Sequence, residues 1–359
     1  MKVYLYDLVG IKSGMNYYLD SLQKLLKDND IDAVVRSNYD NDGLIFYRNM
    51  FTENLFTNIV NMVLNLIKFK LKTIFSKDIS IFLFYGTYVD LIFFFFFFRS
   101  KKVIIDLHET IPRESNSILL KLVIPILFKF SKNTVIYHSQ KIENSILKYG
   151  FTNEMIYVPH FKYKLKKKHQ IKNLGLDIIN AIEKAPVNYL LFGNITKTKG
   201  VLELLDLIEY CNIKARFSNV NFIVAGQDLY RVIKKSKYES TENVDIITRH
   251  INHDELIYLF SECRFILLPY KNVSQSGVLE MAIDFEKQII TSNLKYFKDI
   301  LSKYKSFGYS FDLNDENSFL DVISNSMLNI EAKITKKDIE EYKDYNEFDV
   351  FVKKIKQLM

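Results

Sequence analysis

Small, hydroxyl-bearing and basic residues follow three apolar runs in the second half of the sequence. They are Gly193, Asn194 and Lys199 after YLLF, Gly226 after FIVA, and Ser274, Gln275, Ser276, Gly277 and Val278 after FILLPY. Glycines let backbone N–H groups approach a ligand, a lysine supplies a point charge, and a helix N-terminus carries partial positive charge. A diphosphate needs that set of groups. Converging at one edge of a sheet, the three segments would form a diphosphate site.

The elements that must position these segments alternate regularly between strand and helix. Apolar runs typical of buried parallel strands are MKVYLYDLV, IDAVVRS, ISIFLFYG, KKVIIDLHE, NTVIYHS, EMIYVPH, VNYLLFGNI, VNFIVAGQ, VDIITRH, FILLPY and KQIITSN. Between them, segments such as MNYYLDSLQKLLKD and KGVLELLDLIEYCN have helical spacing. The alternation predicts an α/β protein built from doubly wound parallel sheets, which bind ligands at the carboxyl ends of their strands.

Length and composition favour two folded domains. The 359 residues exceed what one hydrophobic core usually supports, and the basic segment near 162–187 divides the two series of strands. We expect domains at 1–165 and 166–337. The net charge of +7 suits an anionic ligand or surface. Nucleic acid is disfavoured as a partner, because no helix-turn-helix, RNP or zinc pattern accompanies the charge.

Two segments are apolar enough to raise the question of a membrane. The run LIFFFFFF (91–98) is far shorter than the roughly 20 residues of a span, which leaves a buried helix or strand, or an interfacial contact. In 55–75, polar residues recur at helical spacing: Asn58, Asn61, Asn65, Lys68 and Lys72. The stripe fits a helix packed on the sheet with one solvated face, or an amphipathic helix lying on a membrane.

The arrangement resembles the GT-B-fold glycosyltransferases, in particular the group 1 set that includes many bacterial polysaccharide and glycolipid enzymes. Lys199-Gly200 matches the Lys-Gly of that family, although Asn194 stands at its Arg position. PYKNVSQSGVLEMA resembles the later proline strand end, glycine loop and helix, and VPHF (158–161) resembles the strand end before the interdomain linker. GIKSG resembles the glycine-bearing loop near the acceptor and donor sugar, and IIDLHETIPRE resembles the strand and His loop that line the cleft.

The resemblance implies two Rossmann-like domains facing across a cleft, with the helix 338–359 returning to the first domain. It implies roles for the following residues: His108 and Glu109 as catalytic candidates; Gly193, Asn194, Lys199 and 274–278 on the donor diphosphate; Gly226, Arg249, His250 and Glu280 at the nucleobase and ribose; Ser13 and Gly14 in the acceptor or donor-sugar loop. His138 reads instead as structural, because Ser139 has the character of a helix N-cap. No metal and no cofactor are expected, only a UDP- or GDP-linked sugar as donor substrate.

The sequence departs from the family at its pair of glutamates. Aligned on Gly277, these fall on Ser274 and Ala282, so the choice between retention and inversion stays open. We expect a glycosyltransferase that acts on a saccharide, either lipid-linked or part of a surface polysaccharide. The alternatives are a non-catalytic nucleotide-sugar-binding paralogue and a nucleotide-sugar epimerase. Two isolated cysteines and no signal-peptide pattern indicate the cytoplasm, with the inner face of the plasma membrane as a variant of that location.

Overall fold

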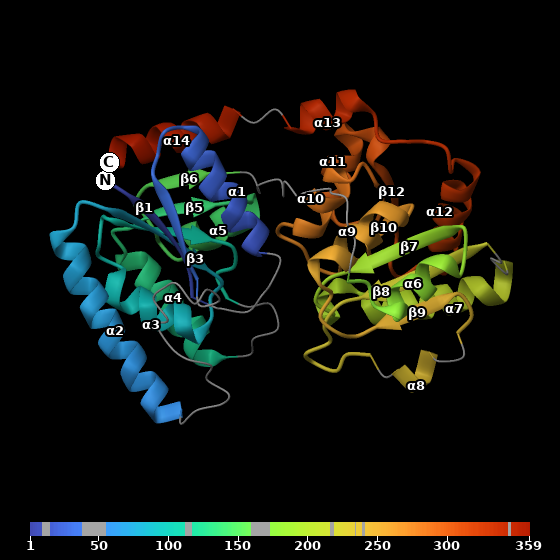
Figure 1. Cartoon of the computed structure of the whole chain (residues 1–359), viewed down its shortest axis with the longest axis horizontal. Coiled ribbons are helices and arrows are strands. Elements are labelled where there is room, and N and C mark those ends of the chain that lie inside the picture. Colours follow the sequence, from blue (N-terminus) through green and yellow to red (C-terminus); the bar gives the residue numbers. More distant parts are fainter. Residues whose placement is uncertain are drawn as a thin grey trace. The chain divides into compact units, whose positions relative to one another are not determined.

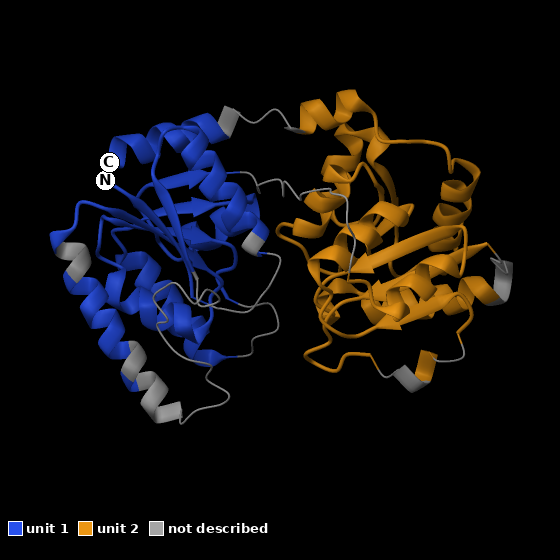
Figure 2. Ribbon diagram, viewed as in Figure 1, with its two compact units in different colours: residues 1–161, 345–359 blue, residues 162–344 orange. Residues whose placement is uncertain are grey.

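The chain forms two compact units, which are coloured separately in Figure 2. In this computed structural model the described residues are 1–8, 15–37, 55–111, 117–158, 173–215, 219–233, 235–238, 241–343 and 346–359. Unit 1 comprises Met1–Phe161 and Tyr345–Met359, and unit 2 comprises Lys162–Asp344. Ser13 and Gly14 lie outside the described residues.

Unit 1 contains a six-stranded parallel sheet with helices around it (Figure 1), and the order of its strands is β2-β1-β3-β4-β5-β6. Its strands are β1 (Val3–Asp7), β2 (Ala33–Ser37), β3 (Ile79–Phe84), β4 (Val103–Leu107), β5 (Thr134–Tyr137) and β6 (Met155–Tyr157). Its helices are α1 (Met15–Asp28), α2 (Leu55–Phe75), α3 (Tyr88–Phe97), α4 (Ile118–Phe130), α5 (Gln140–Lys148) and α14 (Asn346–Leu358). Parallel strands buried on both faces explain the near-continuous apolar runs of the sequence.

The aromatic run 91–98 belongs to helix α3 and not to a strand. Thr87 and Asp90 form a capping box at its start, which fixes the helix register. Phe93, Phe94 and Phe97 then face the sheet and are buried. Among the described residues no helix has both the length and the apolar character needed to cross a bilayer.

Unit 2 contains a second six-stranded parallel sheet, in the order β12-β11-β10-β7-β8-β9. Its strands are β7 (Val187–Phe192), β8 (Val220–Ala225), β9 (Val244–Ile247), β10 (Phe265–Leu268), β11 (Gln288–Ser292) and β12 (Gly308–Phe311). Its helices are α6 (Leu176–Glu183), η1 (Lys197–Lys199), α7 (Val201–Ala215), α8 (Lys235–Tyr238), α9 (His253–Glu262), α10 (Gly277–Asp284), α11 (Lys295–Lys303), η2 (Lys305–Phe307), α12 (Glu316–Leu328) and α13 (Lys336–Lys343). Strand order reverses between β7 and β10, and this reversal defines the point where such sheets bind ligands.

Both sheets confirm the predicted α/β class with doubly wound parallel sheets, but three local expectations need correction. Strand β12 was missed, since GYSF is a short run at the edge of the sheet. The apolar spacing of LYRVIKKSK (229–237) predicts a helix there, but α8 begins only at Lys235, because the Asp228 carboxylate accepts hydrogen bonds from the N–H groups of Val232 and Ile233 and holds a turn before it. The segment 338–359 forms two helices rather than one.

Helix α13 belongs to unit 2, so residues 338–344 lie outside the unit in which the sequence placed them. Two hydrogen bonds explain this. The hydroxyl of Ser306 donates to Asp338 over 2.6 Å, and the hydroxyl of Tyr342 donates to Glu280 over 2.6 Å. Only α14, whose Phe351 and Ile355 are fully buried, joins unit 1.

Candidate functional site

The predicted diphosphate residues of unit 2 converge at the reversal of strand order. Gly193 follows β7 and Gly226 follows β8, and a side chain on Gly226 would overlap the carbonyl oxygen of Gly193. Gly226 also has φ of +151°, a conformation that L side chains rarely adopt. Glycine is therefore required for these two loops to touch.

Lys199 and the start of α10 flank Gly193. A Cβ atom at Gly193 would lie 2.8 Å from Lys199 Nζ and 3.8 Å from Val278 Cγ2. The same ammonium lies 5.8 Å from the ring centroid of Tyr270. Gly193 thus leaves room beside a lysine and a helix N-terminus, which together attract an anion.

Gly200 brings the lysine-bearing turn against the end of β10. Its φ is +66°, and a side chain there would overlap the carbonyl oxygen of Pro269. The N–H of Lys271 also donates to the carbonyl of Thr198 over 2.9 Å. The loops after β7 and β10 are therefore held together by backbone contacts, which fixes where Lys199 lies.

Ser276 is the N-cap of α10, and this role occupies its side chain. The Oγ atom accepts from the N–H of Leu279 over 3.2 Å and lies 3.3 Å from the hydroxyl of Tyr270. Ser274 and Ser276 are both buried, whereas Gly277 is partly exposed. An anion at this site would meet backbone N–H groups of the first helical turn, which lack intrahelical acceptors, rather than the serine hydroxyls.

Arg249 is held in an ion-pair network instead of facing open space. Its guanidinium donates to Asp177 over 2.9 and 2.7 Å and to Glu255 over 2.9 and 2.7 Å. The remaining N–H donates to the carbonyl of His250. The Arg249 guanidinium holds the pKa of the Asp177 carboxyl below its ordinary value. Burial opposes ionisation of Glu255, but the hydrogen bonds from Arg249 still lower its pKa. A nucleobase contact through an Arg249 N–H would have to replace one of these bonds. The exposed His250 is therefore the better candidate for a nucleobase contact.

Glu280 is hydrogen-bonded in the interior of unit 2. It is 3% exposed, and the Tyr342 hydroxyl of α13 donates to its Oε1. A ribose contact through Glu280 would have to compete with this interior hydrogen bond, because the helix register directs the side chain toward α13. Asn194, at the family's Arg position, is exposed next to Gly193.

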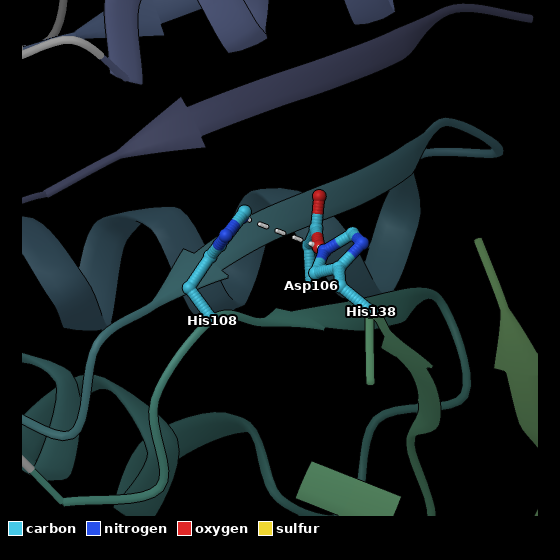
Figure 3. Close-up of side chains that lie close together, drawn as sticks. All are labelled: Asp106, His108 and His138. Carbon is cyan, nitrogen blue, oxygen red and sulfur yellow. Dashed lines mark hydrogen bonds and ion pairs between the residues drawn. The ribbon is translucent and has the colours of Figure 1, made fainter. Parts of the chain in front are cut away.

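In unit 1 a buried polar cluster forms at the carboxyl ends of β4 and β5 (Figure 3). Asp106 Oδ1 lies 2.6 Å from His138 Nε2, and the Tyr18 hydroxyl donates to Asp106 Oδ2 over 2.6 Å. His138 Nδ1 lies 2.7 Å from the carbonyl oxygen of Val158 and therefore donates to it. Since both ring nitrogens face oxygen atoms, one proton must lie between His138 and Asp106.

His108 packs against this cluster. Its ring lies 4.6 Å from that of His138 and 4.7 Å from that of Tyr18, and its Nε2 lies 3.5 Å from Asp106 Oδ1. The side chain is 2% exposed, while its neighbour Glu109 is partly exposed. The structure thus gives His108 a fixed orientation at the end of β4.

Asp106, His108 and His138 also form a possible metal-binding group, because their ligand atoms all lie within 4.8 Å of one another. Two ligands on a tetrahedral zinc ion are about 3.3 Å apart. The 2.6 Å between Asp106 and His138 is instead the length of a charge-assisted hydrogen bond. A metal ion would have to displace that shared proton and separate the two side chains.

Sequence reasoning missed Tyr18 and Asp106. Asp106 lies inside the apolar run VIIDL and is fully buried. A carboxylate within a buried strand needs polar partners, and this was the available signal. The predicted N-cap role of Ser139 is confirmed, because its side chain accepts from the N–H of Ile142 at the start of α5.

The two doubly wound parallel sheets are those of the GT-B glycosyltransferase fold. Similar solved structures cover nearly the whole chain. They include sucrose-phosphate synthase from Thermosynechococcus elongatus, with a TM-score of 0.70 and 15% identity over 100% of this chain and 98% of that one. A UDP-forming α,α-trehalose-phosphate synthase from Burkholderia vietnamiensis has a TM-score of 0.65 and 9% identity over 99% and 98% of the two chains.

HepE of Anabaena, solved with UDP and glucose, has a TM-score of 0.64 and 14% identity over 99% of this chain and 98% of that one. No protein-family description matches the chain, and no curated protein matches it in sequence. At these identities the likeness establishes the fold alone.

Proposed function

We propose that the chain is a metal-independent glycosyltransferase of the hexosyltransferase type that uses a nucleoside-diphosphate sugar as donor. The observation that carries this proposal is the convergence of Gly193, Lys199, Gly226 and the start of α10 at the strand-order reversal of unit 2. A leaving diphosphate gains negative charge as the glycosidic bond breaks. A preorganised ammonium and helix N-terminus stabilise that charge without reorganisation. The UDP present in the HepE structure is consistent with this class of donor.

On the acceptor side the proposal assigns roles to His108 and Glu109. The partly exposed carboxylate of Glu109 is the candidate base for a saccharide hydroxyl, with His108 oriented beside it by the Tyr18–Asp106–His138 cluster. The proposed acceptor is a saccharide that is lipid-linked or part of a surface polysaccharide, handled at the cytoplasmic side of the membrane.

One observation favours the binding paralogue as a second candidate. Ser274 and Ala282 stand where the family's glutamates align, both are buried, and Glu280 is hydrogen-bonded to Tyr342. Such a protein would bind the donor without turning it over. The epimerase alternative would convert the donor sugar and retain the diphosphate.

Release of the nucleoside diphosphate separates these alternatives. The purified chain is incubated with UDP- and GDP-linked sugars, with and without a membrane extract that contains saccharide acceptors. We expect release of one nucleoside diphosphate that depends on the extract and falls strongly in Glu109→Gln, with Asp32→Asn as a carboxylate control at the amino end of β2. Donor binding without any release supports the paralogue, and sugar interconversion without release supports the epimerase.

A further inference from the structure

The outer side of α4 carries a ridge of large apolar side chains. Ile118, Leu122, Ile126 and Phe130 recur at a spacing of four and are 54–74% exposed. That spacing keeps them on one side of the helix. Leu120, Ile124, Leu127 and Phe128 of the same helix are buried against the sheet. The helix is thus apolar on both its inner and its outer side.

Helices α2 and α3 extend this ridge into a wider surface. Exposed apolar side chains of α2 include Val60, Leu64, Ile67, Leu71 and Phe75, at helical spacing, and α3 adds Phe95 at 63% exposure. The inner sides of the three helices enter one core, and α3 packs against both neighbours. They form a layer on one side of the sheet (Figure 1), so their outer sides face the same way.

The charges on this surface have one sign. Helices α2 and α4 contain no Asp or Glu, and the only acidic residue of α3, Asp90, is 1% exposed. Lys68 and Lys70 are exposed on α2, and Lys121 and Lys129 are exposed on α4. Within these three helices the exposed apolar side chains are accompanied by exposed cations alone, and such a face is complementary to an anionic amphiphile.

A pocket at the end of this ridge combines both kinds of side chain. It has a volume of about 470 Å³, and its lining includes Arg99, Lys129 and Lys132 together with Ile126 and Phe130. Three cations beside exposed apolar side chains suit a phosphate whose attached chain is apolar.

We propose that the outer side of α2, α3 and α4 docks on an anionic lipid bilayer, with the pocket of Arg99, Lys129 and Lys132 receiving a lipid phosphate. Ile126, Phe130 and Leu122 then enter the boundary between headgroups and acyl chains, as in interfacial helices. A second copy of the chain fits less well, because a symmetric dimer would place two cationic surfaces against each other. The proposal rests on this surface and not on glycosyl transfer.

Flotation of the full chain with lipid vesicles tests the proposal. One vesicle preparation is phosphatidylcholine and the other includes phosphatidylglycerol. We expect binding to the anionic vesicles at least about tenfold tighter than to the neutral ones. The double variant Leu122→Ser and Ile126→Ser should weaken that binding about tenfold or more, since each change removes apolar area from the bilayer. The triple variant Arg99→Gln, Lys129→Gln and Lys132→Gln should remove the preference for anionic vesicles.

The matched control is the double variant Leu229→Ser and Leu328→Ser, which replaces exposed leucines of unit 2 and should bind vesicles as the parent does. Circular dichroism checks that each variant keeps its fold, as expected for side chains that are mostly exposed. Equal binding to both vesicle types, or binding unchanged by the α4 variant, would overturn the proposal. The proposal would also fail if the parent did not bind vesicles but formed a dimer that the α4 variant dissociates. A second copy of the chain would then cover this surface.

Discussion

Removing the Asp106 carboxylate should destabilise unit 1 severely. Asp106→Ala leaves the Tyr18 hydroxyl and the His138 Nε2 without their acceptor in a site where all three side chains are buried. A bond to a charged group contributes about 1.5–3 kcal/mol, and breaking a buried ion pair costs about 3–5 kcal/mol. We therefore expect a loss of about 3–5 kcal/mol in the free energy of unfolding, out of the roughly 5–15 kcal/mol that a folded domain has.

Native-state hydrogen exchange measures this loss within one unit of a two-unit chain. Amides in β4 and β5 should exchange roughly a hundredfold faster or more in Asp106→Ala, while amides in β8 of unit 2 should not change. Asp106→Asn should recover part of the loss. Its NH₂ group can donate to Nε2 of a neutral His138, and its amide oxygen can accept from the Tyr18 hydroxyl.

The matched control is Asp32→Ala, also in unit 1. Asp32 pairs with Lys2 over 3.1 Å, but both side chains are about half exposed. Solvent screens such a pair, so this variant should exchange as the parent does. If Asp106→Ala and Asp32→Ala behave alike, the buried network does not stabilise unit 1 and the reasoning fails.

Two further predictions concern other buried positions. Gly226→Ala should lower the thermal midpoint and weaken nucleoside-diphosphate binding, because the new methyl group overlaps the Gly193 carbonyl. The control is Gly150→Ala. Gly150 also has a positive φ, but a methyl group there meets only a flexible side chain, so binding should not change. Burial raises the pKa of Asp90 to about 7 despite hydrogen bonds from Thr87. A carboxyl whose pKa is raised on folding contributes stability below its unfolded pKa of about 4, and this contribution is lost as the pH rises to about 7. Asp90→Asn should remove that decline, as thermal midpoints at about pH 5 and about pH 8 would show; an unchanged decline would contradict the assignment.

Local patterns in the sequence were enough to predict most of the fold. Strand and helix alternation depends on apolar periodicity, which is visible in single segments such as VNYLLF and VIIDL. The helix over 55–75 was predicted with the bounds that the structure has. The sequence pattern also predicted that Gly193, Gly226 and the start of α10 converge at one sheet edge, and the observed strand order explains why they do.

Contacts between distant segments were not predictable in the same way. Tyr18 and Asp106 are 88 residues apart, and no local pattern pairs them. The capture of Arg249 by Asp177 and Glu255 likewise depends on how α6 and α9 pack. The sequence also shows that α2 and α4 are apolar, but only the packing shows which of those side chains remain exposed.

The most direct test of the central claim is calorimetric titration of UDP and GDP into the parent chain, Lys199→Ala and Lys197→Ala. Both lysines lie in the same turn, but only Lys199 lies beside Gly193, and Lys197 is exposed. Loss of one charge-assisted bond to phosphate costs about 1.5–3 kcal/mol, or roughly 10- to 150-fold in affinity. We predict that one nucleoside diphosphate binds the parent, that Lys199→Ala weakens it by that factor, and that Lys197→Ala does not. Equal affinities in all three proteins would contradict a diphosphate site at Lys199.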